Sequence, residues 1–290
     1  MIKTILVPVE GGLTDAAVFR TALAAAEPFG AHLLFIHVHV SPGEAVRHVP
    51  GADFALGQGL TGAVEDMRET MAHRDAAALR HFEEFCAQQN IPVVESADTS
   101  DRVTASLRRE RSDPVETLIA AARHCDLVVM GHASGSAGLP GDLIEQVVLG
   151  CGGPVLLAPS APPTRLIGTA IVCWRESPEA VRALTAALPF LARAERVVIA
   201  SVTDDRAASA AGLAGVARRL AGHGISAETW SVEPPIHSST ADQLTSLAQE
   251  LDADLIVAGA YGHSRLRELI FGGVTRSVLE YTRKPVLLAH

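Results

Sequence analysis

Short apolar runs alternate with longer amphipathic stretches along the whole chain. A typical run, Leu127–Met130, is apolar at every position rather than at every second one. Such continuous runs predict strands that are buried on both faces, and therefore a parallel sheet covered by helices. The pattern indicates an α/β fold, Rossmann-like in its alternation of strand and helix.

The two halves of the chain predict the same succession of elements. Strands are expected near Ile5–Val9, Leu33–Val40, Val103–Arg108, Leu127–Met130 and Val155–Ala158, and then near Gly168–Trp174, Arg196–Val202, Ala227–Val232, Leu255–Ala258 and Val286–Ala289. Helices are expected near Asp15–Glu27, Leu60–Gln89, Pro114–Ala122 and Leu143–Leu149, and then near Pro178–Arg193, Ala207–Gly222, Thr240–Glu250 and Ser264–Tyr281. This order predicts two tandem five-stranded parallel sheets flanked by helices.

Internal similarity supports the tandem interpretation. Asp126-Leu127-Val128-Val129-Met130-Gly131 parallels Asp254-Leu255-Ile256-Val257-Ala258-Gly259, and Pro154-Val155-Leu156-Leu157-Ala158 parallels Pro285-Val286-Leu287-Leu288-Ala289. We therefore expect domains at 1–160 and 165–290. The two final strands are apolar edges, and pairing them with each other would protect both in an internal pseudo-dimer, with a homodimer as a further option.

Composition narrows the classes of function. The net charge of −9 and the lack of a basic run argue against nucleic-acid binding. No apolar run approaches the ~20 residues that span a bilayer, so no membrane insertion is expected. The four cysteines share no metal-ligand or CxxC spacing, which is typical of reduced thiols, and we expect a cytoplasmic protein.

The strongest candidate site follows the run Leu255–Ala258. The run stops at Gly259 and continues as Gly259-x-x-Gly262, nine residues, and Gly272-Gly273. Such turns expose backbone N–H groups at a helix start, where unpaired donors and the helix dipole favour anions. We expect a phosphate-bearing ligand at the carboxyl ends of the first and fourth strands of the second copy.

This arrangement resembles the universal stress protein family, whose nucleotide-binding members carry Gly-x-x-Gly, nine residues, and Gly followed by Ser or Thr. The resemblance covers nearly the whole chain as two copies and includes the opening Ile5-Leu6-Val7-Pro8-Val9. It implies ATP as ligand, with Mg²⁺ as the divalent cation. The candidate ligand-binding residues that it implies are Gly259, Tyr261, Gly262, His263, Ser264, Arg265, Gly272, Gly273, Val274, Thr275, Arg175 and Val202.

The chain departs from the family pattern in both copies. Gly273 replaces a Ser or Thr, and Arg175 stands where the family has an Asp that contacts the nucleoside, so ATP itself is less firmly implied than a phosphate-bearing ligand. In the first copy, Glu10 takes that position and Asp142 lies opposite Gly273. A carboxylate there would repel a phosphate by about 1–4 kcal/mol. The first copy is expected to be degenerate for ATP.

Other motifs have ordinary explanations. Gly57-x-Gly59-x-x-Gly62 matches a dinucleotide fingerprint by letters but follows no convincing strand, which favours a flexible loop. The segment Ser41–Leu60 is either a lid or a disordered connection. His37 and His39 share one face of the second strand; without an acidic neighbour in sequence, packed histidines are favoured over a metal site.

The favoured interpretation is a tandem universal stress protein that binds ATP and Mg²⁺ mainly in its C-terminal domain and acts on an unknown protein partner, with a regulatory rather than catalytic role. No convincing catalytic base or arginine finger is found, so any ATP hydrolysis should be slow. One alternative is an interaction protein of the same fold that binds no ATP. A second is an adenylate-forming enzyme, for which His263 is the candidate catalytic residue.

Overall fold

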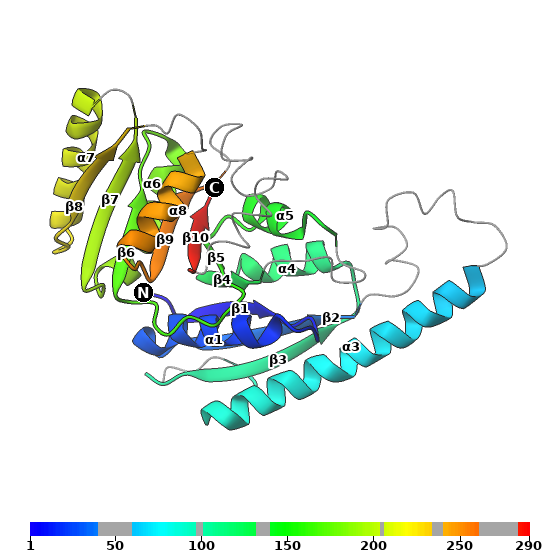
Figure 1. Ribbon diagram of the computed structural model, residues 1–290. Coiled ribbons are helices and arrows are strands. Elements are labelled where there is room, and N and C mark those ends of the chain that lie inside the picture. The colour runs from blue at the N-terminus through cyan, green and yellow to red at the C-terminus, as the bar shows by residue number, and fades with distance from the viewer. Residues whose placement is uncertain (40–59, 97–100, 132–139, 204–205, 234–239, 261–283) are drawn as a thin grey trace. The chain divides into compact units, whose positions relative to one another are not determined.

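The computed structural model describes residues 1–39, 60–96, 101–131, 140–203, 206–233, 240–260 and 284–290 (Figure 1). Contacts divide the chain into a first unit, Ile2–Cys151, and a second unit, Gly152–His290. The predicted helix at Ser264–Tyr281, the glycine pattern 57–59 and the segment 41–59 lie outside the described residues. The predicted domain limits at 160 and 165 stay a prediction about the repeats.

The first unit contains a parallel sheet in the order β3-β2-β1-β4. Its strands are β1 (Thr4–Pro8), β2 (His32–Val38), β3 (Thr104–Glu110) and β4 (Leu127–Met130). Its helices are α1 (Asp15–Ala26), the short 3₁₀ helix η1 (Glu27–Phe29), α3 (Leu60–Gln89), α4 (Pro114–Ala122) and α5 (Leu143–Gly150). The α/β fold and the parallel sheet expected from the apolar runs are confirmed.

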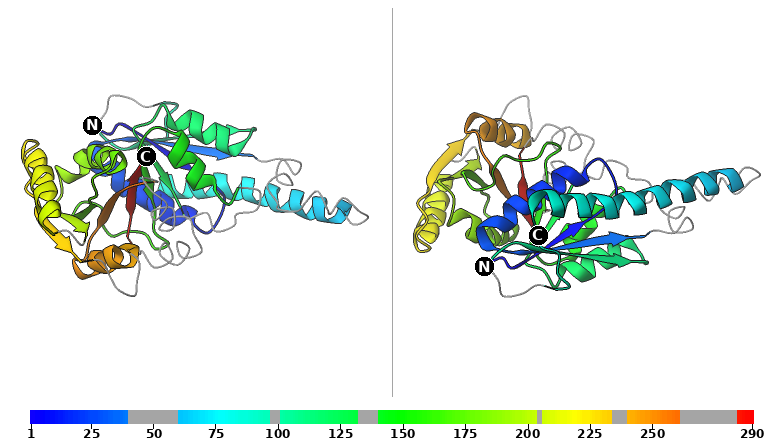
Figure 2. Two further views of the ribbon diagram at one scale, coloured as in Figure 1. Left: turned by 90° about the horizontal axis from the view of Figure 1, so that it is seen from above. Right: turned by 90° about the horizontal axis from the view of Figure 1, so that it is seen from below.

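Helices cover both faces of this sheet, as the views from above and below show (Figure 2). α1 and α3 lie on one face, where Phe19, Phe35, Phe82 and Phe85 form a cluster of edge-to-face rings with centroids 4.9–6.2 Å apart. α4 and α5 cover the other face. The aromatic cluster fixes the C-terminal half of α3 on the sheet, since Phe82 and Phe85 belong to α3 and are buried.

The second unit repeats this plan, with parallel strands in the order β8-β7-β6-β9-β10. Its strands are β6 (Thr169–Cys173), β7 (Arg196–Val202), β8 (Glu228–Val232), β9 (Leu255–Gly259) and β10 (Val286–Ala289). Its described helices are α6 (Pro178–Leu191), α7 (Arg206–Ala221) and α8 (Thr240–Glu250). Leu247 and Ala248 of α8 pack on Ile171, Val198 and Ile256 of the sheet.

The last strand of the first copy belongs by its contacts to the second unit. β5 (Val155–Leu157) pairs antiparallel with β10, and Val286, Leu287 and Leu288 face Leu157, Leu156 and Val155. The predicted pairing of the two final strands is therefore confirmed. Whether the two copies form a symmetric pseudo-dimer stays a prediction.

In each copy, an aspartate just before the fourth strand accepts hydrogen bonds from backbone N–H groups at the start of the first strand. Asp126 accepts hydrogen bonds from the backbone N–H groups of Lys3 (2.7 Å) and Thr4 (3.0 Å). Asp254 accepts one from Thr169 (2.8 Å) and is buried, whereas Asp126 is exposed. The repeat that the sequence predicts is thus visible in side-chain contacts.

Candidate functional site: the carboxyl edges of the two sheets

In the second unit, the chain reverses its direction across the sheet between β6 and β9. β6 pairs with β7 on one side and with β9 on the other, and Cys173 is in register with both Ala200 and Ala258. Helices that leave such neighbouring strands in opposite directions open a crevice at the carboxyl ends, where ligands of open α/β sheets bind. The second unit therefore contains the switch point that the predicted site requires.

Three predicted ligand residues lie at this edge. Gly259 ends β9 and Val202 ends β7. Arg175 follows β6 by two residues and is exposed. Cys173, which ends β6, is in register with Ala200 and Ala258, so Val202 and Gly259 lie at the carboxyl ends of its two neighbouring strands. The remaining candidates, which come from the glycine loops, lie outside the described residues: Tyr261, Gly262, His263, Ser264, Arg265, Gly272, Gly273, Val274 and Thr275.

Gly259 is required by helix packing. A Cβ atom on this residue would lie 2.6 Å from the backbone N of Ala180 and 2.6 Å from the backbone C of Glu179, in the first turn of α6. Because these are backbone atoms, a side-chain rotation cannot relieve the overlap. The sequence interpretation assigned this glycine to a close approach of ligand, and the structure gives it a second reason, the close approach of a helix start.

The start of α6 carries a carboxylate of its own. Ser177 caps the helix by accepting a hydrogen bond from the N–H of Ala180, and Glu179 lies in the first turn. A hydrogen bond from its own backbone N–H, the Ser177 hydroxyl and the nearby Arg182 and His290 lower the pKa of the Glu179 carboxyl. Among the described residues its Oε2 atom is buried and has no hydrogen-bond partner. The first turn of α6, which packs against Gly259, thus carries an ionised carboxylate.

The corresponding edge of the first unit has a different cover. Its cavity measures about 50 Å³ and is lined by residues of the strand ends, α3, α4 and α5: Pro8, Val9, Glu10, Ile36, His37, Val38, Met71, Arg74, Asp75, Pro114, Leu118 and Leu143. Ligand pockets typically measure about 300–1,000 Å³. The space that the described residues leave beside α3 is therefore well below the size of a typical ligand pocket.

The loop after β1 is closed by contacts within the unit. The buried Asp15 accepts hydrogen bonds from the N–H groups of Glu10 (3.1 Å) and Gly11 (2.9 Å). Gly11 has a φ of 67°, and a Cβ there would lie 2.2 Å from the carbonyl oxygen of Arg74. The backbone of α3 therefore rests directly on this loop, and a carboxylate of the protein already satisfies its donors.

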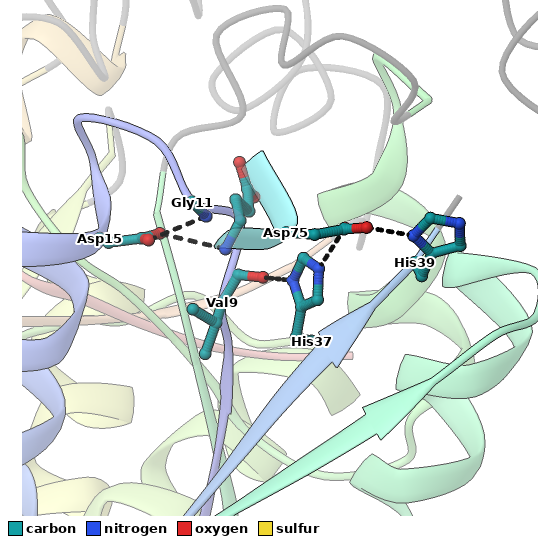
Figure 3. A network of polar contacts seen from close by, with 7 residues as sticks. Val9, Gly11, Asp15, His37, His39 and Asp75 are labelled. Atoms are coloured by element: carbon teal, nitrogen blue, oxygen red, sulfur yellow. Dashed lines mark hydrogen bonds and ion pairs between the residues drawn. The ribbon is translucent and has the colours of Figure 1, made fainter. Parts of the chain in front are cut away.

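His37 and His39 meet the same carboxylate, as Figure 3 shows. His37 contacts the carbonyl oxygen of Val9 through Nδ1 (2.7 Å) and Asp75 Oδ1 through Nε2 (2.7 Å), while His39 Nδ1 contacts Asp75 Oδ2. The sequence interpretation placed both histidines on one face of the strand but expected no acidic partner. That expectation was wrong, because Asp75 comes from α3, more than 30 residues further along the chain.

Two classes of site find no support in the described part of the chain. No group of three or more His, Cys, Asp or Glu side chains there is arranged to hold a metal ion. No helix among the same residues is long and apolar enough to cross a membrane. Asp142 directly precedes α5 at its N-terminus and accepts a hydrogen bond from Gln146 (2.9 Å). Its predicted equivalence to Gly273 stays a prediction, because Gly273 lies outside the described residues.

Both units are thus built as a doubly wound, Rossmann-like α/β protein. The Universal stress protein family model matches residues 1–159 and 235–290. The chain belongs to the universal stress protein family. The unmatched stretch between them contains β6 with Arg175, so the departure noted at that residue falls in the part of the chain least like the family.

Solved structures agree with this fold. The chain aligns with a universal stress protein from Archaeoglobus fulgidus at a TM-score of 0.69 and 17% identity, covering 99% of this chain and 97% of that one. A universal stress protein structure from Pseudomonas aeruginosa gives 0.53 and 17%, with 99% and 93% covered. A universal stress protein of Methanocaldococcus jannaschii is 32% identical over 47 residues, which span 16% of this chain and 29% of that protein.

Proposed function

We propose that this protein is a tandem universal stress protein that binds ATP with Mg²⁺ in its second unit and regulates a partner protein instead of catalysing a reaction. The observation that carries the proposal is the switch point between β6 and β9, where Gly259 ends β9 and the sequence continues into Gly262 and Gly272-Gly273. Free thiols at the four cysteines support a cytoplasmic setting, since reducing compartments keep thiols reduced.

The residues at this edge fit a nucleotide accompanied by a divalent cation. The buried Oε2 atom of Glu179 lacks a partner among the described residues, and carboxylate oxygens together with phosphate oxygens are usual Mg²⁺ ligands. Glu179 would hold the ion near Gly259, and Arg175 would donate to a phosphate. The cation would offset the repulsion between the carboxylate and the phosphates, which makes ATP binding depend on Mg²⁺.

The direct test is isothermal titration of the full chain with ATP, with Mg²⁺ and then with EDTA. We expect one site per chain, and weaker binding in EDTA. Glu179→Gln should reduce the ratio of the ATP dissociation constant in EDTA to that with Mg²⁺. The neutral amide removes the carboxylate that would bind Mg²⁺, and it also removes the repulsion between this carboxylate and the phosphates. No heat and no thermal shift at millimolar Mg-ATP would refute the nucleotide proposal.

A pair of exchanges between the copies locates the site. Gly273→Asp gives the second copy the carboxylate that Asp142 supplies in the first, and it should abolish ATP binding. Gly273→Ala retains the backbone N–H and should preserve most of the affinity for ATP. The control is Asp142→Gly in the first copy, which should leave the affinity unchanged. Equal affinity of Gly273→Asp and the parent protein would place the ligand elsewhere.

A regulatory role requires that ATP change a population of conformations without being consumed. Binding would favour one conformation of the protein and with it one surface for a partner. We expect no product from Mg-ATP over hours at micromolar protein, beyond a slow background. A turnover that disappears in His263→Ala would instead favour the enzyme interpretation.

One observation favours a second candidate, an interaction protein of the same fold that binds no nucleotide. Gly259 is needed to seat α6, and Glu179 places negative charge at the helix start. Both features can exist without a ligand. The same titration separates the two functions, since this second candidate gives no heat with ATP under any condition.

A further inference from the structure

Histidine–carboxylate contacts hold the middle of α3 on the first unit. Asp75 bridges His37 and His39 at the end of β2, and one turn and a half further along α3, His81 Nδ1 contacts Asp15 Oδ2 (2.8 Å). His37 and Asp15 are buried. The three imidazoles lie on the face where α3 covers the loop after β1, so this coverage depends on contacts between histidines and carboxylates.

The contacts of His37 require an extra proton. The carbonyl oxygen of Val9 only accepts hydrogen bonds, so Nδ1 must carry a hydrogen. A neutral imidazole then has a lone pair on Nε2, which faces Asp75 Oδ1 at 2.7 Å. Two lone pairs at that distance repel each other. The contact between His37 and Asp75 is therefore stable only when one additional proton lies between Nε2 and Oδ1, beyond those of a neutral imidazole and an ionised carboxylate.

The neighbouring charges leave this proton demand in place. Glu10 and Arg74 line the same cavity as His37 and Asp75. On the adjacent strand, Arg109 and Glu110 are in register with His37 and Val38, and Glu110 forms an ion pair with Arg108. From α4 and α5 the cavity receives only the apolar Pro114, Leu118 and Leu143. The described contacts of Asp75 Oδ1 and of His37 Nε2 are with each other, so the proton demand of this contact stays local to the pair.

The two halves of α3 are held differently. From Ala78 onward, Phe82, Phe85 and Cys86 are buried in the apolar core, and two of them join the aromatic cluster. Before Ala78, the helix has Met71 as its one buried residue among those described, and Glu65, Asp66, Arg68, Glu69 and Thr70 are exposed. Loss of the His37–Asp75 contact would therefore loosen the turns around Asp75 and leave the later turns in place.

We propose that the first unit contains a proton-dependent clasp, in which one proton shared by His37 and Asp75 fastens the Met71–Ala77 part of α3 over the carboxyl ends of β1 and β2. When the pH rises and the proton leaves, the turn lifts and uncovers this edge of the first sheet. The first copy thereby responds to acidity, and the clasp does not depend on any nucleotide in the second unit.

Hydrogen–deuterium exchange of the full chain by mass spectrometry tests the clasp. Rates are measured between pH 6 and pH 8 and corrected for the intrinsic pH dependence of amide exchange. Peptides from 71–77 should exchange at least about tenfold faster at pH 8, because a single linked proton changes the opening constant by up to about tenfold per pH unit. Peptides from 82–89 should show no such change and serve as an internal control.

Two variants make the test specific. Asp75→Asn supplies an amide that donates to Nε2 and accepts from His39, so exchange of 71–77 should lose its pH dependence. His73→Gln removes an exposed histidine two residues away and should behave as the parent protein. Equal exchange of 71–77 at pH 6 and pH 8 in the parent protein overturns the proposal, and this arm stands even if Asp75→Asn fails to fold.

A metal ion is the competing occupant of the same position. The exchange series is therefore repeated with EDTA and with added Zn²⁺. An unchanged profile supports the proton. Protection at pH 8 that appears with Zn²⁺ and disappears with EDTA would show that a cation other than the proton fastens α3, and the proposal would then be wrong.

Discussion

Replacing Asp254 by Ala should destabilise the second unit selectively. The carboxylate is buried, accepts a hydrogen bond from the N–H of Thr169 at 2.8 Å and contacts Arg165 Nε at 3.0 Å. A hydrogen bond to a charged group contributes about 1.5–3 kcal/mol, and its loss leaves a strand N–H without its acceptor. Since the Arg165 side chain is 49% exposed, solvent screens the ion pair, and we assign most of the loss to the hydrogen bond.

The two tryptophans make this change easy to follow. Trp174 and Trp230 are the only tryptophans of the chain, and both lie in the second unit. Urea denaturation monitored by tryptophan fluorescence thus reports on that unit. A loss of about 2–3 kcal/mol with a urea slope of about 2 kcal/mol per M lowers the midpoint by about 1–1.5 M. Asp254→Asn retains an acceptor oxygen and should therefore lower the free energy of unfolding by less than Asp254→Ala does.

The first copy supplies the control. Asp126 makes the corresponding contacts with the N–H groups of Lys3 and Thr4, but it is exposed and lies in the unit that lacks tryptophan. Asp126→Ala should leave the tryptophan transition in place. If both alanine variants shift the midpoint equally, or if Asp254→Ala shifts it by less than about 0.3 M, then the assignment of the stability to this buried hydrogen bond is wrong.

The remaining predictions concern packing and thiol chemistry. Gly259→Ala should cost about 1–3 kcal/mol in the tryptophan-monitored transition, because its Cβ overlaps backbone atoms of α6; Gly153→Ala, with nothing within 4 Å of its Cβ, is the control, and equal midpoints would contradict the clash. Burial raises the pKa of the Cys86 and Cys125 thiols to about 11 and of Cys173 to about 12. At pH 8 a thiol with a raised pKa stays protonated and reacts slowly. A maleimide should therefore label these cysteines about a hundredfold more slowly than in urea-unfolded protein, as measured by mass spectrometry of peptides. Fast labelling of the folded chain would contradict this prediction.

Local patterns predicted much of the fold because local forces decide it. The continuous runs of Leu127–Met130 and Arg196–Val202 form strands with those bounds, since only a sheet covered on both faces buries them. The helices 60–89 and 114–122 also have their predicted bounds; the second begins at a proline after Asp113, whose side chain caps it. The apolar edges of the two final strands predicted the pairing of β5 with β10.

The parts that the sequence did not predict depend on contacts between distant segments. Asp75 has no sequence signal that connects it to His37 and His39, because a long helix must first return across the sheet to bring them together. The glycine pattern implied only a ligand contact at Gly259, whereas the packing of the start of α6 also requires a glycine there. A search for a carboxylate on the helix facing a His-x-His strand end would have detected Asp75 as a partner.

The pairing of β5 with β10 also has a consequence for synthesis on the ribosome. β5 emerges roughly 130 residues before its antiparallel partner, which at 5–20 residues per second is about 6–26 s. During that interval the β10-facing edge of Val155–Leu157 has no partner within its own chain, so nascent chains on one polysome present the same apolar strand to each other. Slow translation of the second copy would lengthen this exposure, and the yield of folded protein should fall with it.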